Sequence, residues 1–122
     1  MNKRMAGTEG ERQAAEYLEA RSFRILERNF RCTQGEIDII GVHEGYLVFV
    51  EVKYRSSDGK GSAAQAVNMK KQRRICRTAD YYRYVNRLTE DTGVRYDVVA
   101  IQGKEIRWIQ NAFSHIYASR SR

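Results

Sequence analysis

The order of apolar and polar residues changes period several times along the chain. Near the N-terminus the apolar residues recur at helical spacing, at Ala14, Ala15 and Leu18. This spacing predicts a first helix from about Glu9 to Arg21. A strand from about Phe23 to Arg28 should follow, with an irregular continuation over Asn29–Thr33.

The clearest pattern in the sequence is a β-hairpin. The segments Glu36–Ile40 and Tyr46–Lys53 both read as strands, and Val42–Gly45 between them contains turn residues. In the second strand both alternating sets of positions carry apolar residues, which predicts a central strand covered on both faces. Charges come only at the end of this strand, at Glu51 and Lys53.

A loop and a long helix follow the hairpin. The segment Tyr54–Ser62 is rich in Ser and Gly, which predicts a flexible loop. The helix lies within Ala63–Val85, and its apolar residues recur on one side. The residues predicted to face the core are Ile75, Ala79 and Tyr82, joined by Gln72 and Cys76.

Two strands complete the predicted order of elements. The segments Val94–Ile101 and Glu105–Gln110 read as strands joined by a turn. Residues 111–117 should form a short helical or irregular tail, and residues 118–122 a frayed end. The order α-β-β-β-α-β-β predicts a single α/β domain over residues 1–122, with a central mixed sheet flanked by helices.

Charge narrows the class of partner. Lys and Arg number 22 against 15 Asp and Glu, a formal net charge of +7. Such an excess favours nucleic acid or an anionic membrane surface, although it can also serve solubility alone. The longest strongly apolar run, Tyr46–Val50, is too short to cross a bilayer, and the N-terminus lacks the apolar core of a signal peptide. We therefore expect a cytoplasmic protein that binds no membrane.

Cysteine and histidine do not predict a zinc site. The two cysteines, Cys32 and Cys76, form no C-x-x-C motif, and the two histidines, His43 and His115, are far apart in the sequence. We expect the cysteines to be reduced. Ligands for a metal ion would then come from carboxylates.

Acidic residues converge at the end of the hairpin. Because side chains alternate along a strand, Glu51 and Lys53 share one face, and Glu36 and Asp38 share one face of the neighbouring strand. If these faces coincide, Asp38, Glu51 and Lys53 lie together. Two carboxylates about 4 Å apart repel by roughly 4 kcal/mol at an effective dielectric constant of about 20. Such a pair needs a proton or a metal ion, and oxygen ligands without His or Cys favour Mg²⁺ or Mn²⁺.

This cluster predicts phosphodiester chemistry, with a structural alternative. A divalent ion can polarise a phosphodiester and activate water, while a neighbouring lysine stabilises negative charge in the transition state. The alternative is a ladder of cross-strand salt bridges. Glu11 could join the cluster from the first helix, but its spacing from Thr8 also matches a capping box at a helix start.

A set of spaced motifs now carries a resemblance to a known family. The motifs are Gly10-Glu11, Gly35–Ile40 and Leu47–Lys53, and the likeness continues through Lys71-Gln72, Tyr96–Val99 and Ile109–Phe113. Together they resemble the PD-(D/E)XK nuclease superfamily, and most of all its YraN-like branch of small bacterial proteins. Ile37 replaces the proline that gives the superfamily its name.

The resemblance implies a restriction-endonuclease-like fold similar to that of archaeal Holliday junction resolvases. By motif match, Asp38 and Glu51 would be metal ligands, and the carbonyl group of Val52 would also face the ion. Lys53 would be the catalytic lysine. Glu11 would match the first-helix glutamate of the resolvase-like members, a role that can coexist with a capping box.

Residues outside the cluster are candidate contacts to nucleic acid. A contact of this kind holds the phosphate backbone without reading bases, whereas a solvated helix face and a disordered loop are the alternatives. The Tyr and Arg residues at positions 81–84 suggest base stacking, or else a core stripe with a polar rim. The candidate contacts are Arg55, Lys60, Lys70, Lys71, Gln72, Arg74 and Arg77.

We therefore expect a DNA endonuclease that depends on Mg²⁺ or Mn²⁺ and acts on linear or branched DNA. Symmetric cutting of a junction would favour a homodimer with two-fold symmetry. One alternative is a nucleic-acid-binding protein that retains the fold without catalysis. Another is a protein-interaction subunit whose acidic cluster is only a network of salt bridges.

Overall fold

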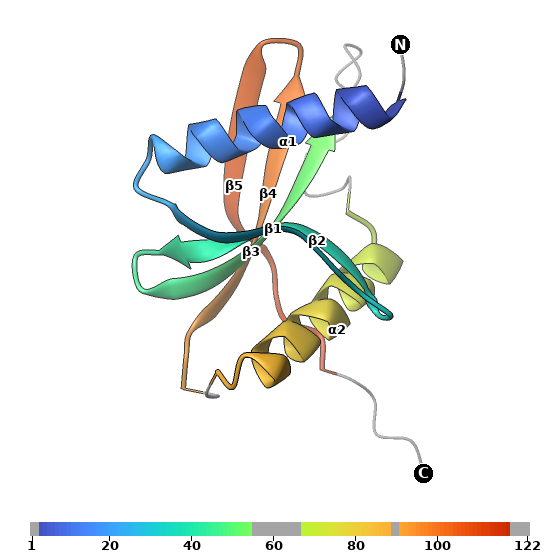
Figure 1. Ribbon diagram of the computed structural model, residues 1–122, viewed down its shortest axis with the longest axis vertical. Coiled ribbons are helices and arrows are strands. Elements are labelled where there is room, and N and C mark those ends of the chain that lie inside the picture. The colour runs from blue at the N-terminus through green and yellow to red at the C-terminus, as the bar shows by residue number, and fades with distance from the viewer. Residues whose placement is uncertain (1–2, 55–66, 89–90, 118–122) are drawn as a thin grey trace.

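The computed structural model describes residues 3–54, 67–88 and 91–117 (Figure 1). Over these residues the elements follow the predicted order α-β-β-β-α-β-β, which confirms the α/β class. The elements are α1 (Lys3–Glu19), β1 (Arg24–Cys32), β2 (Gly35–His43), β3 (Tyr46–Tyr54), α2 (Met69–Val85), β4 (Val94–Gln102) and β5 (Glu105–Phe113).

The five strands form one mixed sheet in the order β1-β2-β3-β4-β5. The pairs β1–β2, β2–β3 and β4–β5 are antiparallel, whereas β3 and β4 are parallel. A parallel pair needs a crossover connection, and the connection that contains α2 provides it. β3 is therefore the middle strand, as the apolar residues on both of its faces predicted.

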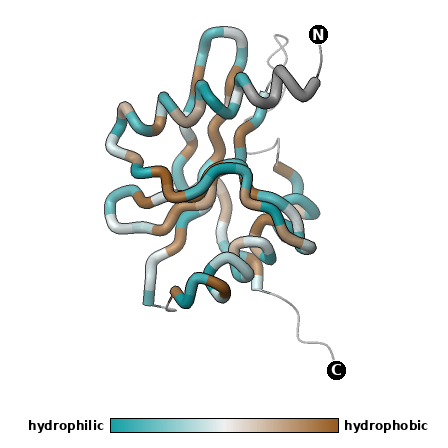
Figure 2. The backbone as a smooth tube through the Cα atoms, in the orientation of Figure 1, coloured by the Kyte–Doolittle hydropathy of each residue, from teal (hydrophilic) through white to brown (hydrophobic). Residues whose placement is uncertain are grey.

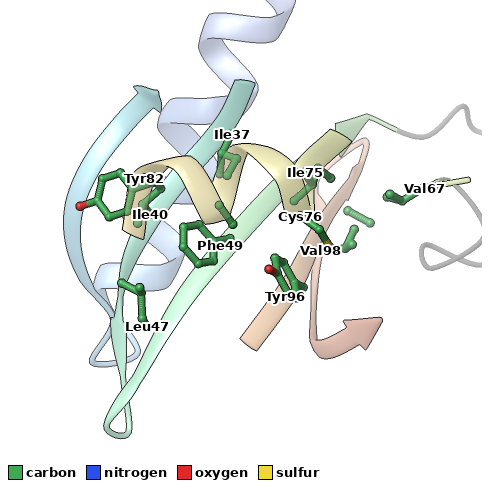
Figure 3. Close-up of a cluster of buried hydrophobic side chains, with 12 residues drawn as sticks. Ile37, Ile40, Leu47, Phe49, Val67, Ile75, Cys76, Tyr82, Tyr96 and Val98 are labelled. Atoms are coloured by element: carbon green, nitrogen blue, oxygen red, sulfur yellow. The ribbon is translucent and has the colours of Figure 1, made fainter. Parts of the chain in front are cut away.

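The two helices cover opposite faces of the sheet (Figure 1). α1 buries Ala14, Ala15 and Leu18 against one face, and Figure 3 shows the other cluster, in which α2 packs on β2, β3 and β4. The hydropathy colours of Figure 2 alternate along both helices, as expected when one side of a helix is buried. Each large aliphatic side chain buried in this way contributes about 1.5–3 kcal/mol.

The first helix begins earlier than the sequence predicted. α1 starts at Lys3, so Thr8 lies inside the helix and the prediction of a capping box there is wrong. The packing of α1 against Tyr54 explains why this helix contains a glycine at position 10. A Cβ atom at this position would overlap the aromatic ring of Tyr54, so α1 crosses the end of β3 at a distance that only glycine permits.

The edge strands are also longer than predicted. β1 continues to Cys32, and β5 continues to Phe113, where an irregular or helical tail was expected. In both cases the neighbouring strand offers backbone partners over the added length. The register shifts once in each of these pairs, between Ile25 and Glu27 of β1 and between Tyr96 and Val98 of β4.

Local features at two places fix the elements around the site. The β2–β3 hairpin turns on Glu44 and Gly45, with φ angles of 51° and 83°, which suits a two-residue turn of type I′. The side chain of Asn68 caps α2 by accepting a hydrogen bond of 2.9 Å from the backbone N–H of Lys71. Most of the predicted loop Tyr54–Ser62 and the predicted frayed end lie outside the described residues.

Among the described helices, none combines the length and the apolar character that crossing a bilayer requires.

Candidate metal centre

The ladder between β2 and β3 ends just before the acidic residues. The last paired residues are Ile39 and Val50, so Asp38 and Glu51 come next on the two strands. There the backbone N–H of Val52 donates to Oδ2 of Asp38 at 2.7 Å. A side-chain oxygen thus takes the place that a backbone carbonyl occupies in the ladder. The N–H and C=O groups of one strand residue point to the same side, so the carbonyl of Val52 also lies on the Asp38 side of β3.

Asp38 and Glu51 lie side by side, as the alternation of side chains predicted. Glu51 is only 5% exposed, and Asp38 is half-buried. Burial, a hydrogen bond with Glu51 and the charge of Glu51 raise the pKa of Asp38 from 3.8 to about 9, although the N–H of Val52 lowers it. Asp38 therefore keeps its proton at neutral pH as long as no further cation neutralises the pair.

Lys71 reaches this pair from the first turn of α2. Its Nζ lies 2.9 Å from Oε2 of Glu51, and its side chain is 42% exposed. Burial alone lowers the pKa of Lys71, but the hydrogen bond and charge of Glu51, together with the charge of Asp38, raise it overall. The sequence placed Lys71 among the candidate phosphate contacts, with a solvated helix face as the alternative; the structure brings it to the carboxylates.

A signal for the position of Lys71 was present in the sequence. Lys71 precedes Ile75 by four residues, and residues at this spacing share one side of a helix. Ile75 was already predicted to face the core. Helical periodicity therefore directs Lys71 toward the sheet at the start of α2, and the reading of it as a surface charge missed this.

Lys53 comes two residues after Glu51 in the sequence, and Gln72 directly follows Lys71. Lys53 follows Glu51 by two positions on β3, so both side chains leave the same face of the strand, and Lys53 is half-buried. The side-chain amide of Gln72 donates to the carbonyl oxygen of Val67 at 2.8 Å. Gln72 therefore ties down the chain where it enters α2.

Glu11 and Glu36 are less closely connected to the pair. The charge of Glu11 is the last of the influences that raise the pKa of Asp38, which places α1 within electrostatic reach of the site. Glu36 is exposed and pairs with Arg31 of β1 at 2.9 Å. In the part of the chain that the structure describes, no three His, Cys, Asp or Glu side chains form a group able to hold a metal ion. The role of Glu11 as a ligand stays a prediction.

The residues present nevertheless fit a small divalent ion. Oε2 of Glu51 is buried, and among the described residues the ammonium group of Lys71 lies 2.9 Å from it. Mg²⁺ is commonly held by one or two carboxylates, with water and substrate phosphate completing its shell. Asp38, Glu51 and the carbonyl of Val52 supply hard oxygen ligands of this kind.

Cations line the outer side of α2, next to the site. Lys70, Arg74 and Arg77 are exposed, and their spacing places them in one stripe along the helix. Arg55 and Lys60 lie outside the described residues. Among the described residues, the exposed cations of the predicted phosphate-binding surface are therefore those of this stripe.

The tyrosines of α2 divide between core and surface. Tyr82 is 7% exposed and packs edge-on against Phe30 and Phe49. Tyr81 and Tyr84 are 44% and 81% exposed and continue the stripe of cations toward the C-terminal end of the helix. The prediction of a core stripe with a rim is thus confirmed for this helix.

Over the described residues, the fold and the site define an α/β protein with two helices on opposite faces of a mixed sheet and a pair of neighbouring carboxyl groups beside a basic helix. The chain belongs to the family described as "Uncharacterised protein family UPF0102", which residues 10–101 match.

Relatives in this family are similar over nearly the whole chain. A UPF0102 protein of Lachnoclostridium phytofermentans is 53% identical over 113 residues, which cover 93% of this chain and 96% of the relative. A UPF0102 protein of Aliivibrio fischeri strain MJ11 is 46% identical, covering 91% of this chain and 93% of the relative. One of Thermodesulfovibrio yellowstonii is 44% identical, covering 88% and 94%.

Proposed function

We propose that this protein is a DNA endonuclease of the PD-(D/E)XK type, dependent on Mg²⁺ or Mn²⁺. The observation that carries the proposal is the pair of half-buried Asp38 and buried Glu51, placed where the β2–β3 ladder ends and next to the N–H of Val52. Two neighbouring carboxylates do not stabilise a scaffold, because they repel when both are ionised. A site that binds a divalent ion and phosphate needs this excess of negative charge.

Each residue has a defined part in this chemistry. A bound divalent ion would polarise the scissile phosphate and lower the pKa of a water molecule. Asp38 and Glu51 fix its position, with the carbonyl of Val52 as a further oxygen. Lys53, on the same strand face as Glu51, stabilises negative charge as it develops on the phosphate.

The basic stripe of α2 explains how a polyanion approaches an acidic centre. Lys70, Arg74 and Arg77 are exposed on the helix whose first turn contacts Glu51 through Lys71. Phosphate contacts from these residues would hold the backbone in register without selecting a base sequence. The net charge of +7 then attracts DNA over a longer range.

Cleavage assays with matched variants test this proposal. Single-stranded, duplex and branched DNA are incubated with wild-type protein and Mg²⁺ or Mn²⁺, and cutting is compared with that of Asp38→Asn, Glu51→Gln and Lys53→Met. We expect each variant to lose about 100-fold or more in cleavage rate. Glu36→Gln, an exposed change on the strand of Asp38, is the control and should cut normally. Equal cutting by wild type and all site variants would contradict the proposal.

A second candidate function is nucleic-acid binding without catalysis. The observation that favours it is the basic stripe, which lies on the outer side of α2 and does not depend on the acidic pair. Binding measured in a chelator should then weaken as salt rises, and Arg74→Gln with Arg77→Gln should reduce the slope of log affinity against log salt by about 0.9 per lost duplex phosphate contact. Such binding without any metal-dependent cutting would favour this function over the first.

A further inference from the structure

The contact between Lys71 and Glu51 occupies the place where a metal ion would be held. Lys71 Nζ lies 2.9 Å from Oε2 of Glu51, and Oε2 belongs to a side chain that is 6% exposed. This oxygen is also buried away from solvent. The ammonium group thus supplies the positive charge next to it.

When both carboxylates are ionised, one ammonium group leaves one negative charge unmatched. Lys71 carries a single positive charge and pairs with Glu51, while Asp38 accepts from the N–H of Val52. A divalent cation would match both carboxylates at once. Its bonds to oxygen, about 2.0–2.1 Å long for Mg²⁺, are shorter than the lysine contact.

The lysine side chain has a route away from the carboxylates. Its side chain is 42% exposed, and it leaves the first turn of α2, which the side chain of Asn68 caps. Movement of the long and flexible side chain into solvent therefore needs no change in the helix. Because two cations at one carboxylate repel, binding of an ion favours this movement.

We propose that Lys71 is an exchangeable counter-ion, which neutralises Glu51 in the metal-free site and is released toward the DNA when a divalent ion binds. This inference rests on the proposed function and adds a positioning residue to the same site. The released ammonium lies at the end of the stripe formed by Lys70, Arg74 and Arg77, where it adds one cation for phosphate. Loading of the ion and binding of the nucleic-acid backbone are then coupled through one side chain.

The proposal predicts that removing a positive group improves metal binding specifically at position 71. Calorimetric titration with Mn²⁺ compares wild type, Lys71→Met and Lys70→Met. Methionine keeps most of the apolar stem, and Lys70, the exposed neighbour, controls for the loss of one charge near the site. We expect Lys71→Met to bind Mn²⁺ about fivefold more tightly, and Lys70→Met to change the affinity by less than about twofold.

A second measurement uses the wild-type protein alone. An amine-reactive reagent, read out by mass spectrometry, should label Lys71 faster when Mn²⁺ is present, because the released ammonium is more exposed. Labelling of Lys70 should not change. Thermal unfolding of Lys71→Met verifies that the variant is folded.

The outcomes separate this inference from the proposed function. Tighter binding by Lys71→Met, together with faster labelling of Lys71, supports the exchange. Mn²⁺ binding by wild type with equal or weaker binding by Lys71→Met overturns the exchange and leaves the proposed function intact. No Mn²⁺ binding by either protein overturns the proposed metal site, and the exchange with it.

Discussion

Asp38 on β2 is half-buried and Asp97 on β4 is fully buried, and the hydrogen bonds around the two carboxyl groups differ. Asp97 is 0% exposed, and each of its oxygens accepts two hydrogen bonds. Oδ1 accepts from Nε of Arg95 and the N–H of Asn111, both at 2.9 Å. Oδ2 accepts from the Arg95 guanidinium at 2.9 Å and from Nε1 of Trp108 at 2.8 Å.

Among the described residues, Asp38 has fewer partners. One oxygen accepts from the N–H of Val52, and the carboxyl group also meets the carboxyl group of Glu51. Around Asp97 the guanidinium of Arg95 is itself enclosed, since it also contacts Nδ1 of His43 at 2.9 Å. A carboxylate whose oxygens already accept all the hydrogen bonds they can has no capacity left for a ligand. Asp38 and Glu51 accept fewer hydrogen bonds from the described residues and retain that capacity.

The comparison separates scaffold from site by hydrogen-bond completeness instead of burial. Asp97 connects β4 to β5 through Trp108 and Asn111, at the place where the register between these strands shifts. Its role is to hold the sheet together. Asp38 and Glu51 carry neighbouring carboxyl groups instead, and under the proposed function this negative charge serves to bind a cation.

The largest expected effect is loss of stability in Asp97→Asn. An amide in place of one carboxylate oxygen would point N–H groups at Arg95 or Trp108, which are themselves donors, and would leave the guanidinium without its counter-charge. Breaking a buried pair in this way costs about 3–5 kcal/mol in the free energy of unfolding. Urea denaturation measures it. A loss below about 1 kcal/mol would mean that the Asp97 cluster is no scaffold.

A dependence of stability on pH is expected for the Asp38 site. The folded protein holds the proton of Asp38 more tightly than the unfolded chain, with a pKa of about 9 in place of 3.8. Stability from this group is therefore complete below pH 3.8 and is lost as the pH rises toward 9. In a chelator, the free energy of unfolding should fall by up to about 1.4 kcal/mol per pH unit within this range.

The Asp38→Asn variant isolates this contribution. Asparagine stays neutral at every pH and can still accept a hydrogen bond from the N–H of Val52, so the variant should lack the decline. The difference in unfolding free energy between variant and wild type should grow from pH 5 to pH 8, measured by urea denaturation at each pH. A constant difference would show that Asp38 is ionised in the metal-free fold.

A third effect compares the two aspartates through metal binding. At a Mn²⁺ concentration 100 times its dissociation constant, a protein with one site is stabilised by about 2.7 kcal/mol. We expect this gain for wild type at pH 8, and the same gain for Asp97→Asn on top of its lower starting stability. Asp38→Asn should gain much less. Thermal or urea unfolding with and without Mn²⁺ measures all three, and equal gains in all of them would place the ion elsewhere.

The sequence predicted the site of Asp38 and Glu51 better than the cluster around Asp97. Strand alternation and the turn before Tyr46 set the hairpin, and they brought Asp38 opposite Glu51 without any tertiary information. Asp97 and Arg95 lie on a strand that was predicted from its apolar positions, so their charges gave no sign of burial. Only the packing of α1 and β5 around them makes that face of β4 interior.

Long-range contacts account for the other differences. Lys71 meets Glu51 across the connection of β3 to α2, and no local pattern fixes where that helix starts relative to the sheet. The start of α1 was placed too late because Thr8 and Glu11 match a capping box, whereas the helix begins at Lys3. Periodicity finds faces of elements, but it does not find which side chains meet across them.

The smallest expected effect concerns Glu36, a carboxylate that is neither fully hydrogen-bonded like Asp97 nor part of the Asp38–Glu51 pair. Glu36 lies two residues before Asp38 and pairs with Arg31 at 2.9 Å, but both side chains are more than half exposed. Exposed pairs of this kind contribute about 0.2–1 kcal/mol and are screened by salt. Glu36→Gln should therefore change the free energy of unfolding by no more than about 0.5 kcal/mol, with no difference between pH 5 and pH 8 and no loss of the gain from Mn²⁺. A larger change, or a weaker response to Mn²⁺, would extend the site along β2 beyond Asp38 and would make the contrast between the two aspartates incomplete.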